Sequence, residues 1–251
     1  MRLIITAFRF LTIIPVPFSH HGSAGDLGRS APFFPLVGLI IGAILVLADM
    51  LMTPFLPRHL TDALLVTLLA IITGALHLDG LADVCDGLAA RGDRKRFLDV
   101  MKDSRVGAVG VVGIVLGLLL KYSALLALPI FVKRPALLLF PAIARFVQVL
   151  VMAGARGARS DGLGATLLSG MTKASFSFAA AVIIPAAWYL CGWAGLGALL
   201  SASVWGLMVR WYFTGRLGGI TGDIVGFASE TAEISALIKI TAITVLMMRF
   251  Q

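Results

Sequence analysis

The sequence predicts an all-α integral membrane protein, folded as a single polytopic domain over residues 1–251. We expect a bundle of about seven transmembrane helices with a polar site that faces the cytoplasm. Hydrophobic residues make up 59% of the chain and charged residues only 14%, whereas a soluble domain carries roughly 25% charged residues. The mean hydropathy of +0.98 indicates the same class. Long apolar segments alternate with three polar, glycine-rich stretches, so the chemistry is expected in the connections.

The N-terminal segment is a short helix candidate that ends before Pro15. It is too short to cross a bilayer comfortably, so we expect it to lie at the interface or to re-enter the membrane. Longer apolar segments follow. The predicted spans lie at about residues 33–52, 62–78, 106–128, 135–153, 176–191, 196–213 and 234–248. In the third span, Gly113 and Gly117 form a GxxxG pattern, which favours close helix packing.

Lysine and arginine are unevenly distributed between the two sets of connections. With the N-terminus inside and the C-terminus outside, the inner connections carry most of these residues, as the positive-inside rule requires. The polar stretches at residues 79–105, 154–173 and 215–233 then share the cytoplasmic face, where they can build one site. The same bias, with contacts to anionic lipid or phosphate, accounts for the net charge of +8. We therefore predict a membrane-lipid partner and no nucleic-acid partner.

The first polar stretch carries the strongest chemical signal. Asp79, Asp83 and Asp86 stand at positions i, i+4 and i+7, which puts three carboxylates on one helical face. Because like charges at this spacing repel, we expect a cation between them. Hard carboxylate oxygens without extra histidine or cysteine favour Mg²⁺ or Mn²⁺ over zinc. The alternative is a charged, solvated loop between two apolar helices.

Glycine and cysteine within this stretch have their own expected roles. Gly80 and Gly87 interrupt the helical face at a cost of roughly 1 kcal/mol each relative to alanine. Both allow a bulky ligand or a second backbone to approach closely. Cys85 is interpreted as a small packing residue. Cys85 and Cys191 are the two cysteines of the sequence, too few and too far apart for a disulfide framework or a metal site.

The third polar stretch mirrors the first. Asp223 and Glu230 supply carboxylates, while the amides around Gly219, Thr221 and Gly222 are suited to cradle phosphate oxygens. Taken alone, this pattern fits a tight turn before the last span equally well. Paired with the aspartates on the same face, it indicates the second wall of a nucleotide and metal site. In the middle stretch, a capping or turn role is expected for Asp161.

Ionisable residues within or next to the spans need partners or water, because a charge at bilayer depth is expensive. Arg145 lies in mid-span, so we expect it to face the interior and to bind substrate or form an ion pair. Lys121 and Lys239 are expected to snorkel to the interface. His77 directly precedes the acidic face, where a base, a hydrogen-bond donor or a purely structural residue would all fit.

Four segments together resemble a known family. They read HLDGLADVCDGLAARGDRKRFLDVMKDSRVGAVG, GGITGDIVGFASETAE, FRFLTIIPVP and GRSAPFFPLVGLIIG. In these motifs, over nearly the whole chain, the sequence closely resembles the cobalamin synthase family, the adenosylcobinamide-GDP ribazoletransferases. The VCD segment and the AAR tail of the first motif are less typical of that pattern.

The resemblance implies an enzyme of the bacterial inner membrane that acts late in corrinoid synthesis. Such an enzyme joins adenosylcobinamide-GDP to α-ribazole or its 5′-phosphate, releases GMP, and requires Mg²⁺. The oligomeric state stays open, a homo-oligomer included.

This chemistry needs charge neutralisation and alignment more than covalent participation. We hypothesise that metal is held by Asp79, Asp83, Asp86 and Asp103, with Asp223 and Glu230 completing the set or binding the acceptor. Substrate would be bound by Lys102, Arg105, Arg145, Gly219, Thr221 and Gly222. The catalytic candidates are Asp83, Asp103 and His77, and the sequence does not choose between the two aspartates as base.

Two alternatives come from other classes. Residues 83–91 read DVCDGLAAR, which is close to the opening motif of the CDP-alcohol phosphotransferases, and this likeness would imply lipid synthesis. The residues expected downstream are out of register. An ion-coupled transporter would use the buried charges but predicts inverted repeats, and the sequence shows no convincing internal repeat.

Overall fold

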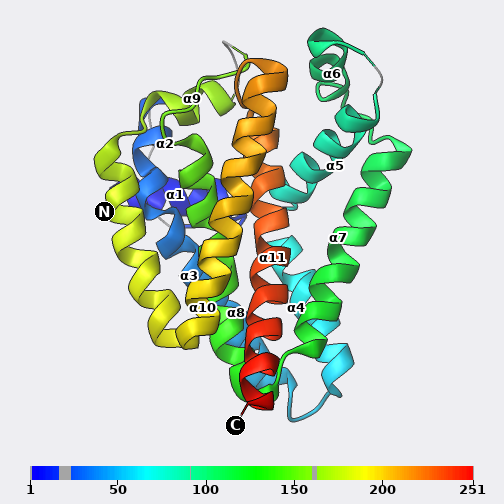
Figure 1. Cartoon of the computed structure of the whole chain (residues 1–251), viewed down its shortest axis with the longest axis vertical. Helices are drawn as coiled ribbons and strands as arrows, with labels where there is room; N and C mark the ends of the chain where they lie inside the picture. The colour runs from blue at the N-terminus through cyan, green and yellow to red at the C-terminus, as the bar shows by residue number, and fades with distance from the viewer. Residues whose placement is uncertain (1, 17–23, 91, 160–162, 251) are drawn as a thin grey trace.

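The computed structural model describes residues 2–16, 24–90, 92–159 and 163–250 (Figure 1). Over these ranges the chain is helical apart from loops and one parallel β-bridge between Gly157 and Ile220. The elements are α1 (Arg2–Leu11), α2 (Ala24–Ser30), the 3₁₀ turn η1 (Ala31–Phe33), α3 (Phe34–Met52), α4 (Arg58–Ile72), α5 (Leu76–Ala89), α6 (Arg94–Val100), α7 (Ala108–Ala127), α8 (Ile130–Met152), α9 (Leu163–Ser169), α10 (Lys173–Leu217) and α11 (Gly222–Arg249).

Five helical segments are long and apolar enough to cross a membrane, and the bent pair α4–α5 would make a sixth span. The five are Gly25–Met52, α7, α8, α10 and α11. This count takes α10 once, although Gly192 breaks it with non-helical backbone angles (φ 53°, ψ −133°). Figure 1 shows α10 as two arms joined at the lower end of the bundle. These arms correspond to the predicted spans at 176–191 and 196–213, and the prediction of an all-α membrane bundle is confirmed.

Helix α8 forms the centre of the bundle, packed against α3, α10 and α11. Most of its side chains are buried, so it has no broad face left for lipid. Gly38 lets α3 approach α8 closely, because a Cβ there would lie 2.5 Å from the Cα of Ala142. Small residues therefore set the α3–α8 contact, as is common where helices associate within membranes.

The predicted close-packing face on α7 is also confirmed. A Cβ at Gly113 would lie 2.7 Å from Cys85 Sγ, and one at Gly117 would lie 3.0 Å from a methyl group of Leu81. Both neighbours belong to α5. The GxxxG pattern thus seats α7 against the helix that carries the acidic face, and Cys85 has the packing role expected of it.

The predicted span at 62–78 is broken. Helix α4 ends at Ile72, and α5 leaves it at an angle of 89°. Gly74 (φ 58°) and Ala75 (φ 55°) both adopt left-handed backbone angles in the joint. The chain after α1 supports this joint, since the Ile13 N–H donates to the carbonyl of Ile72 at 2.8 Å. The break turns the acidic helix toward the upper end of the molecule in Figure 1.

Helix α1 is the short helix predicted at the N-terminus. It packs against α2 and α3, and its Ala7 and Leu11 are buried. With 10 residues it extends about 15 Å, half of a hydrocarbon core. It covers the flank of the bundle next to the α4–α5 joint.

The three polar stretches gather at the upper end of the bundle in Figure 1. The Ala158 N–H donates to Ile220 O and the Ile220 N–H donates to Arg156 O, both at 2.9 Å, which joins the second stretch to the third. Arg94, at the start of α6, donates to Leu217 O and Ala158 O, both at 2.7 Å, which joins the first stretch to the other two. The prediction that these stretches share one end of the bundle is confirmed.

A charged cluster ties the opposite end together. Lys133 of α8 lies 2.6 Å from a carboxylate oxygen of Asp49 on α3 and 2.6 Å from one of Asp62 on α4. Arg134 adds a 2.9 Å contact to Asp49. These pairs link three helices, so Lys133 and Arg134 have a structural role at this end of the bundle.

Candidate functional site

The site is built where α5 crosses α11. The crossing is close because Gly80 of α5 has no side chain, and a Cβ there would lie 2.7 Å from the carbonyl of Asp223. Gly226 faces the backbone of Gly80 and His77 from the other side. The prediction that Gly80 admits a second backbone is therefore confirmed. The crossing carries Asp223, in the first turn of α11, to the acidic face of α5.

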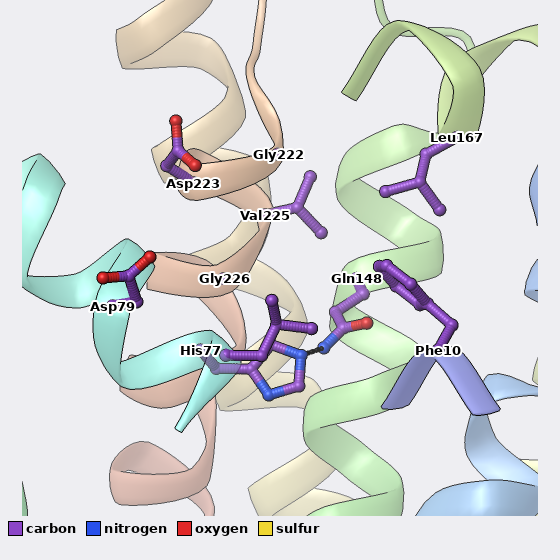
Figure 2. Close-up of a pocket in the computed structure, with 10 residues that line it drawn as sticks. Phe10, His77, Asp79, Gln148, Leu167, Gly222, Asp223, Val225 and Gly226 are labelled. Atoms are coloured by element: carbon purple, nitrogen blue, oxygen red, sulfur yellow. Dashed lines mark hydrogen bonds between the residues drawn. The ribbon is translucent and has the colours of Figure 1, made fainter. Parts of the chain in front are cut away.

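Three carboxylates come together at this crossing, and we call Asp79, Asp83 and Asp223 the carboxylate cluster. Asp83 lies within electrostatic reach of both other members, and Asp79 also acts on Asp223. Asp79 is exposed and the other two are half-buried. Figure 2 shows Asp79 and Asp223 on neighbouring helices beside the same cavity. Mutual repulsion makes this arrangement unfavourable unless a cation is added.

The cavity beside the cluster has a volume of about 70 Å³ and is lined by residues from five helices, α1, α5, α8, α9 and α11. His77 lies in its wall with 4% of its surface exposed. The Gln148 amide nitrogen lies 2.8 Å from His77 Nε2 and donates to Ser229 Oγ at 2.8 Å (Figure 2). This chain of contacts fixes the imidazole in the wall of the cavity that Asp79 and Asp223 also line, and a role for His77 in the chemistry stays a prediction.

Asp86 occupies a different place from its two neighbours on the acidic face. Its carboxylate accepts the N–H of Gly107 at 2.7 Å and the N–H of Gly110 at 2.8 Å. These are free amides at the start of α7, and a carboxylate there also meets the positive end of the helix dipole. A Cβ at Gly107 would lie 2.5 Å from the same carboxylate. Asp86 therefore caps α7, a use that the metal-ligand prediction did not include.

Asp103, Lys102 and Arg105 lie in the exposed connection between α6 and α7. Arg105 donates to both oxygens of Asp103, at 3.0 and 2.8 Å. These hydrogen bonds hold the pKa of the Asp103 carboxyl at about 2, so it is ionised at neutral pH. Asp103 and Arg105 line a second hollow together with Asp86. The structure does not bring Asp103 into the carboxylate cluster.

Glu230 and Arg145 belong to a buried ion network rather than to the cluster. Lys121 of α7 pairs with Glu230 and Glu233 of α11, and Arg145 of α8 pairs with Glu233. All four side chains are almost completely buried. The expected ion-pair role of Arg145 is observed, whereas the carboxylate predicted to bind metal at Glu230 is engaged by a lysine. The expectation that Lys121 snorkels is wrong, and Lys239 is exposed as snorkelling requires.

The predicted phosphate cradle has mostly structural contacts. A Cβ at Gly219 would lie 2.7 Å from the nitrogen of Ala158, so glycine is needed for the β-bridge. Thr221 is the N-cap of α11: its hydroxyl accepts the N–H of Ile224 and donates to Asp223 Oδ2, both at 3.3 Å. Gly222 lines the cavity beside the cluster. Asp161 lies outside the residues that the structure describes.

Two residues of the site were missed in the sequence. Gln148 is a polar residue in the middle of an apolar span, and that position alone is a signal of function. Arg159 is the cation that acts on both Asp83 and Asp223, from the connection between α8 and α9. Its signal was weak, because a basic residue in an inner connection already follows from the positive-inside rule.

The carboxylate cluster suits a hard divalent cation, because its donor atoms are carboxylate oxygens. Such an ion would also relieve the repulsion between the carboxylates. Over the residues that the structure describes, no group of three or more His, Cys, Asp or Glu side chains is arranged to hold a metal ion. Mg²⁺ typically uses one or two carboxylates with water and substrate phosphates, so a complete protein cage is not required. The carboxylates supply suitable donors for Mg²⁺, whose binding stays a prediction.

The chain matches the family model described as cobalamin-5-phosphate synthase over residues 3–241. It is 52% identical over 243 residues to the adenosylcobinamide-GDP ribazoletransferase of Geotalea daltonii, covering 97% of this chain and 98% of that one. Proteins with the same name from Thermoanaerobacter sp. and Pseudomonas savastanoi pv. phaseolicola are 32% and 37% identical. These alignments cover 97% and 93% of this chain and 98% and 96% of the relatives. No solved structure gives a significant match.

Proposed function

Because the chain belongs to the cobalamin-5-phosphate synthase family, we propose that it catalyses the reaction for which its relatives are named. The phospho-cobinamide moiety of adenosylcobinamide-GDP would be transferred to α-ribazole or α-ribazole 5′-phosphate, giving adenosylcobalamin or its 5′-phosphate and GMP. The observation that carries this proposal is the carboxylate cluster, formed by α5 and α11 where the polar stretches meet. The family match disfavours the lipid-synthesis and transporter alternatives.

Mg²⁺ is the proposed cofactor, and one or two carboxylates of the cluster (Asp79, Asp83 and Asp223) would hold it together with water and the phosphates of the substrate. When bound, it would supply charge neutralisation at the diphosphate of the donor, which is the main requirement of such transfers. Two observations support this choice: the crowding of like charges in the cluster and the hard oxygen donors. The predicted ligands Asp86, Asp103 and Glu230 have other partners, and we propose secondary roles for them at most.

The transfer does not require a covalent bond between the substrate and the protein. The acceptor hydroxyl forms a new P–O bond to the phosphorus on the cobinamide side, and the bond to the GMP oxygen breaks. The hydroxyl proton must leave to a base. Asp83 is better placed for this than Asp103, because it lies in the cluster whereas Asp103 is exposed and clamped by Arg105. His77 is the second candidate, from the wall of the adjoining cavity.

The proposed location is the bacterial inner membrane, with the site facing the cytoplasm. The distribution of lysine and arginine supports this orientation. Several helices are long enough to cross a bilayer, and the site lies at the end of the bundle where the basic polar stretches gather. Soluble nucleotide substrates could then reach it from the cytoplasm.

The test is GMP release by the purified, detergent-solubilised protein supplied with adenosylcobinamide-GDP and α-ribazole 5′-phosphate, with and without Mg²⁺. We expect release that stops when Mg²⁺ is removed and returns when it is restored. Asp83→Asn and Asp223→Asn should lower kcat at least about a hundredfold, as expected for groups that act on charge in the transition state. Asp99→Asn, an exposed carboxylate of α6, should keep the wild-type rate. Release of CMP from CDP-diacylglycerol instead of GMP from the corrinoid would overturn the proposal.

A further inference from the structure

The residues just before Arg159 are held by backbone and side-chain contacts. The β-bridge pairs Gly157 with Ile220, and the Ala158 N–H donates to Ile220 O at 2.9 Å. The Arg94 guanidinium donates to the carbonyl of Ala158 at 2.7 Å. Because its preceding residue is fixed in this way to the starts of α6 and α11, Arg159 has a defined position, although it lies in a connection.

The Arg159 side chain is only partly satisfied by the protein. Its Nη2 donates to the carbonyl of Leu98 at 2.8 Å. Its Nε is buried and has no hydrogen-bond partner among the residues that the structure describes. A buried N–H without an acceptor is unfavourable, so the position invites an acceptor from outside the chain.

The charge of Arg159 acts on Asp83 of α5 and on Asp223 of α11. A diphosphate held at the carboxylates through a cation would therefore come close to this guanidinium, which is opposite in charge to the diphosphate. A guanidinium presents several N–H donors in a rigid fork that matches phosphate oxygens, and it cannot lose its proton. Lysine would bring the same charge without the fork.

We propose that Arg159 binds the diphosphate of the nucleotide-activated substrate and thereby determines the specificity of the site for that donor. This inference rests on the proposed function, since it assigns a role within the same reaction. The proposal treats the two substrates differently. Arg159 contacts the donor, adenosylcobinamide-GDP, and does not contact the acceptor.

The test compares Arg159→Ala and Arg159→Lys with the control Arg156→Ala. Arg156 lies three positions earlier in the same connection, and its side chain is exposed. Arg159→Ala should raise KM for adenosylcobinamide-GDP about tenfold to a hundredfold, the range that follows from losing a charge-assisted contact. KM for α-ribazole 5′-phosphate should stay unchanged. Arg159→Lys should give a smaller rise, and Arg156→Ala none.

A second measurement does not depend on turnover. GDP with Mg²⁺ should raise the Tm of the wild-type protein and of Arg156→Ala but not that of Arg159→Ala. This separates the two proposals: a wild-type protein that binds GDP but releases no GMP would refute the proposed reaction and leave the Arg159 assignment standing.

A purely structural role for Arg159 predicts other results. Its loss would then lower Tm without ligand and affect both KM values or neither, and this pattern would overturn the assignment. An increase confined to the KM of the acceptor would overturn it as well. If Arg159→Ala does not fold, Arg159→Lys decides, because an unchanged KM for the donor in that variant refutes the proposal.

Discussion

At the scale of single residues, the ionisable side chains differ in whether the chain itself supplies the opposite charge. The buried ion network is neutral within the protein, since two basic residues face two acidic ones. Such pairs are costly to bury and still more costly to break. In the part of the chain that the structure describes, the three acids of the carboxylate cluster have one cation acting on them, Arg159, and Asp86 adds a further negative charge near Asp83. An imbalance of this kind is typical of a binding site, whereas a balanced network is typical of structure.

Asp86 and Asp83 should respond oppositely to the same substitution. Asp86→Asn replaces one acceptor of the α7 cap with an N–H₂ group and removes its charge, so the free energy of unfolding should fall by about 1–2 kcal/mol. Asp83→Asn removes repulsion within the cluster and should leave stability unchanged or higher. Thermal unfolding in detergent measures both. Equal losses of Tm in the two variants would contradict the distinction between cap and cluster.

Lys121 should be needed for stability rather than for chemistry. Lys121→Met leaves Glu230 without its partner in a buried position, and such a loss costs about 3–5 kcal/mol. The matched control is Lys239→Met on the exposed side of α11, which should not change Tm. A Lys121→Met protein with the wild-type Tm would show that the network is not formed.

At the scale of elements, the decisive feature is the joint between α4 and α5. The sequence predicted a continuous span there because the apolar run from residue 62 to 78 contains no proline. Gly74 was the one local signal, and Ala75 gave none, since alanine strongly favours helix. The hydrogen bond from the Ile13 N–H to the carbonyl of Ile72 is a tertiary contact between segments that are far apart in the sequence. Local preference was overridden, and the break could not be read from the segment alone.

The left-handed backbone at Ala75 in this joint should be strained. Ala75 has φ 55°, a left-handed angle that costs an L-residue with a Cβ about 1–2 kcal/mol. Ala75→Gly should therefore raise the free energy of unfolding by about 1 kcal/mol, because its side chain is exposed and loses no packing. Ala63→Gly, in the exposed interior of α4, should lower it by roughly 0.5–1 kcal/mol. The same sign for both variants would refute the left-handed joint.

At the scale of the whole molecule, the bundle brings three distant stretches to one end. The membrane class, the glycine face of α7 and the shared end of the polar stretches were predictable. They follow from composition, from spacing within one segment and from the distribution of lysine and arginine over the connections, respectively. The hydrogen-bond partners of Asp86 and Glu230 could not be predicted, because these partners lie 21 or more residues away in the sequence. Spacing reports which residues share a helical face, and only packing decides which neighbours that face meets.

The most direct test of the account is whether a divalent cation binds at the crossing of α5 and α11. Mn²⁺ can replace Mg²⁺ as a hard cation, and the EPR signal of free Mn²⁺ measures how much is bound in the presence of adenosylcobinamide-GDP. We predict saturable binding by the wild-type protein and by Asp99→Asn, and its loss in Asp83→Asn and in Asp223→Asn. Equal Mn²⁺ binding by all four proteins would contradict the claim that these two helices form one metal-dependent site.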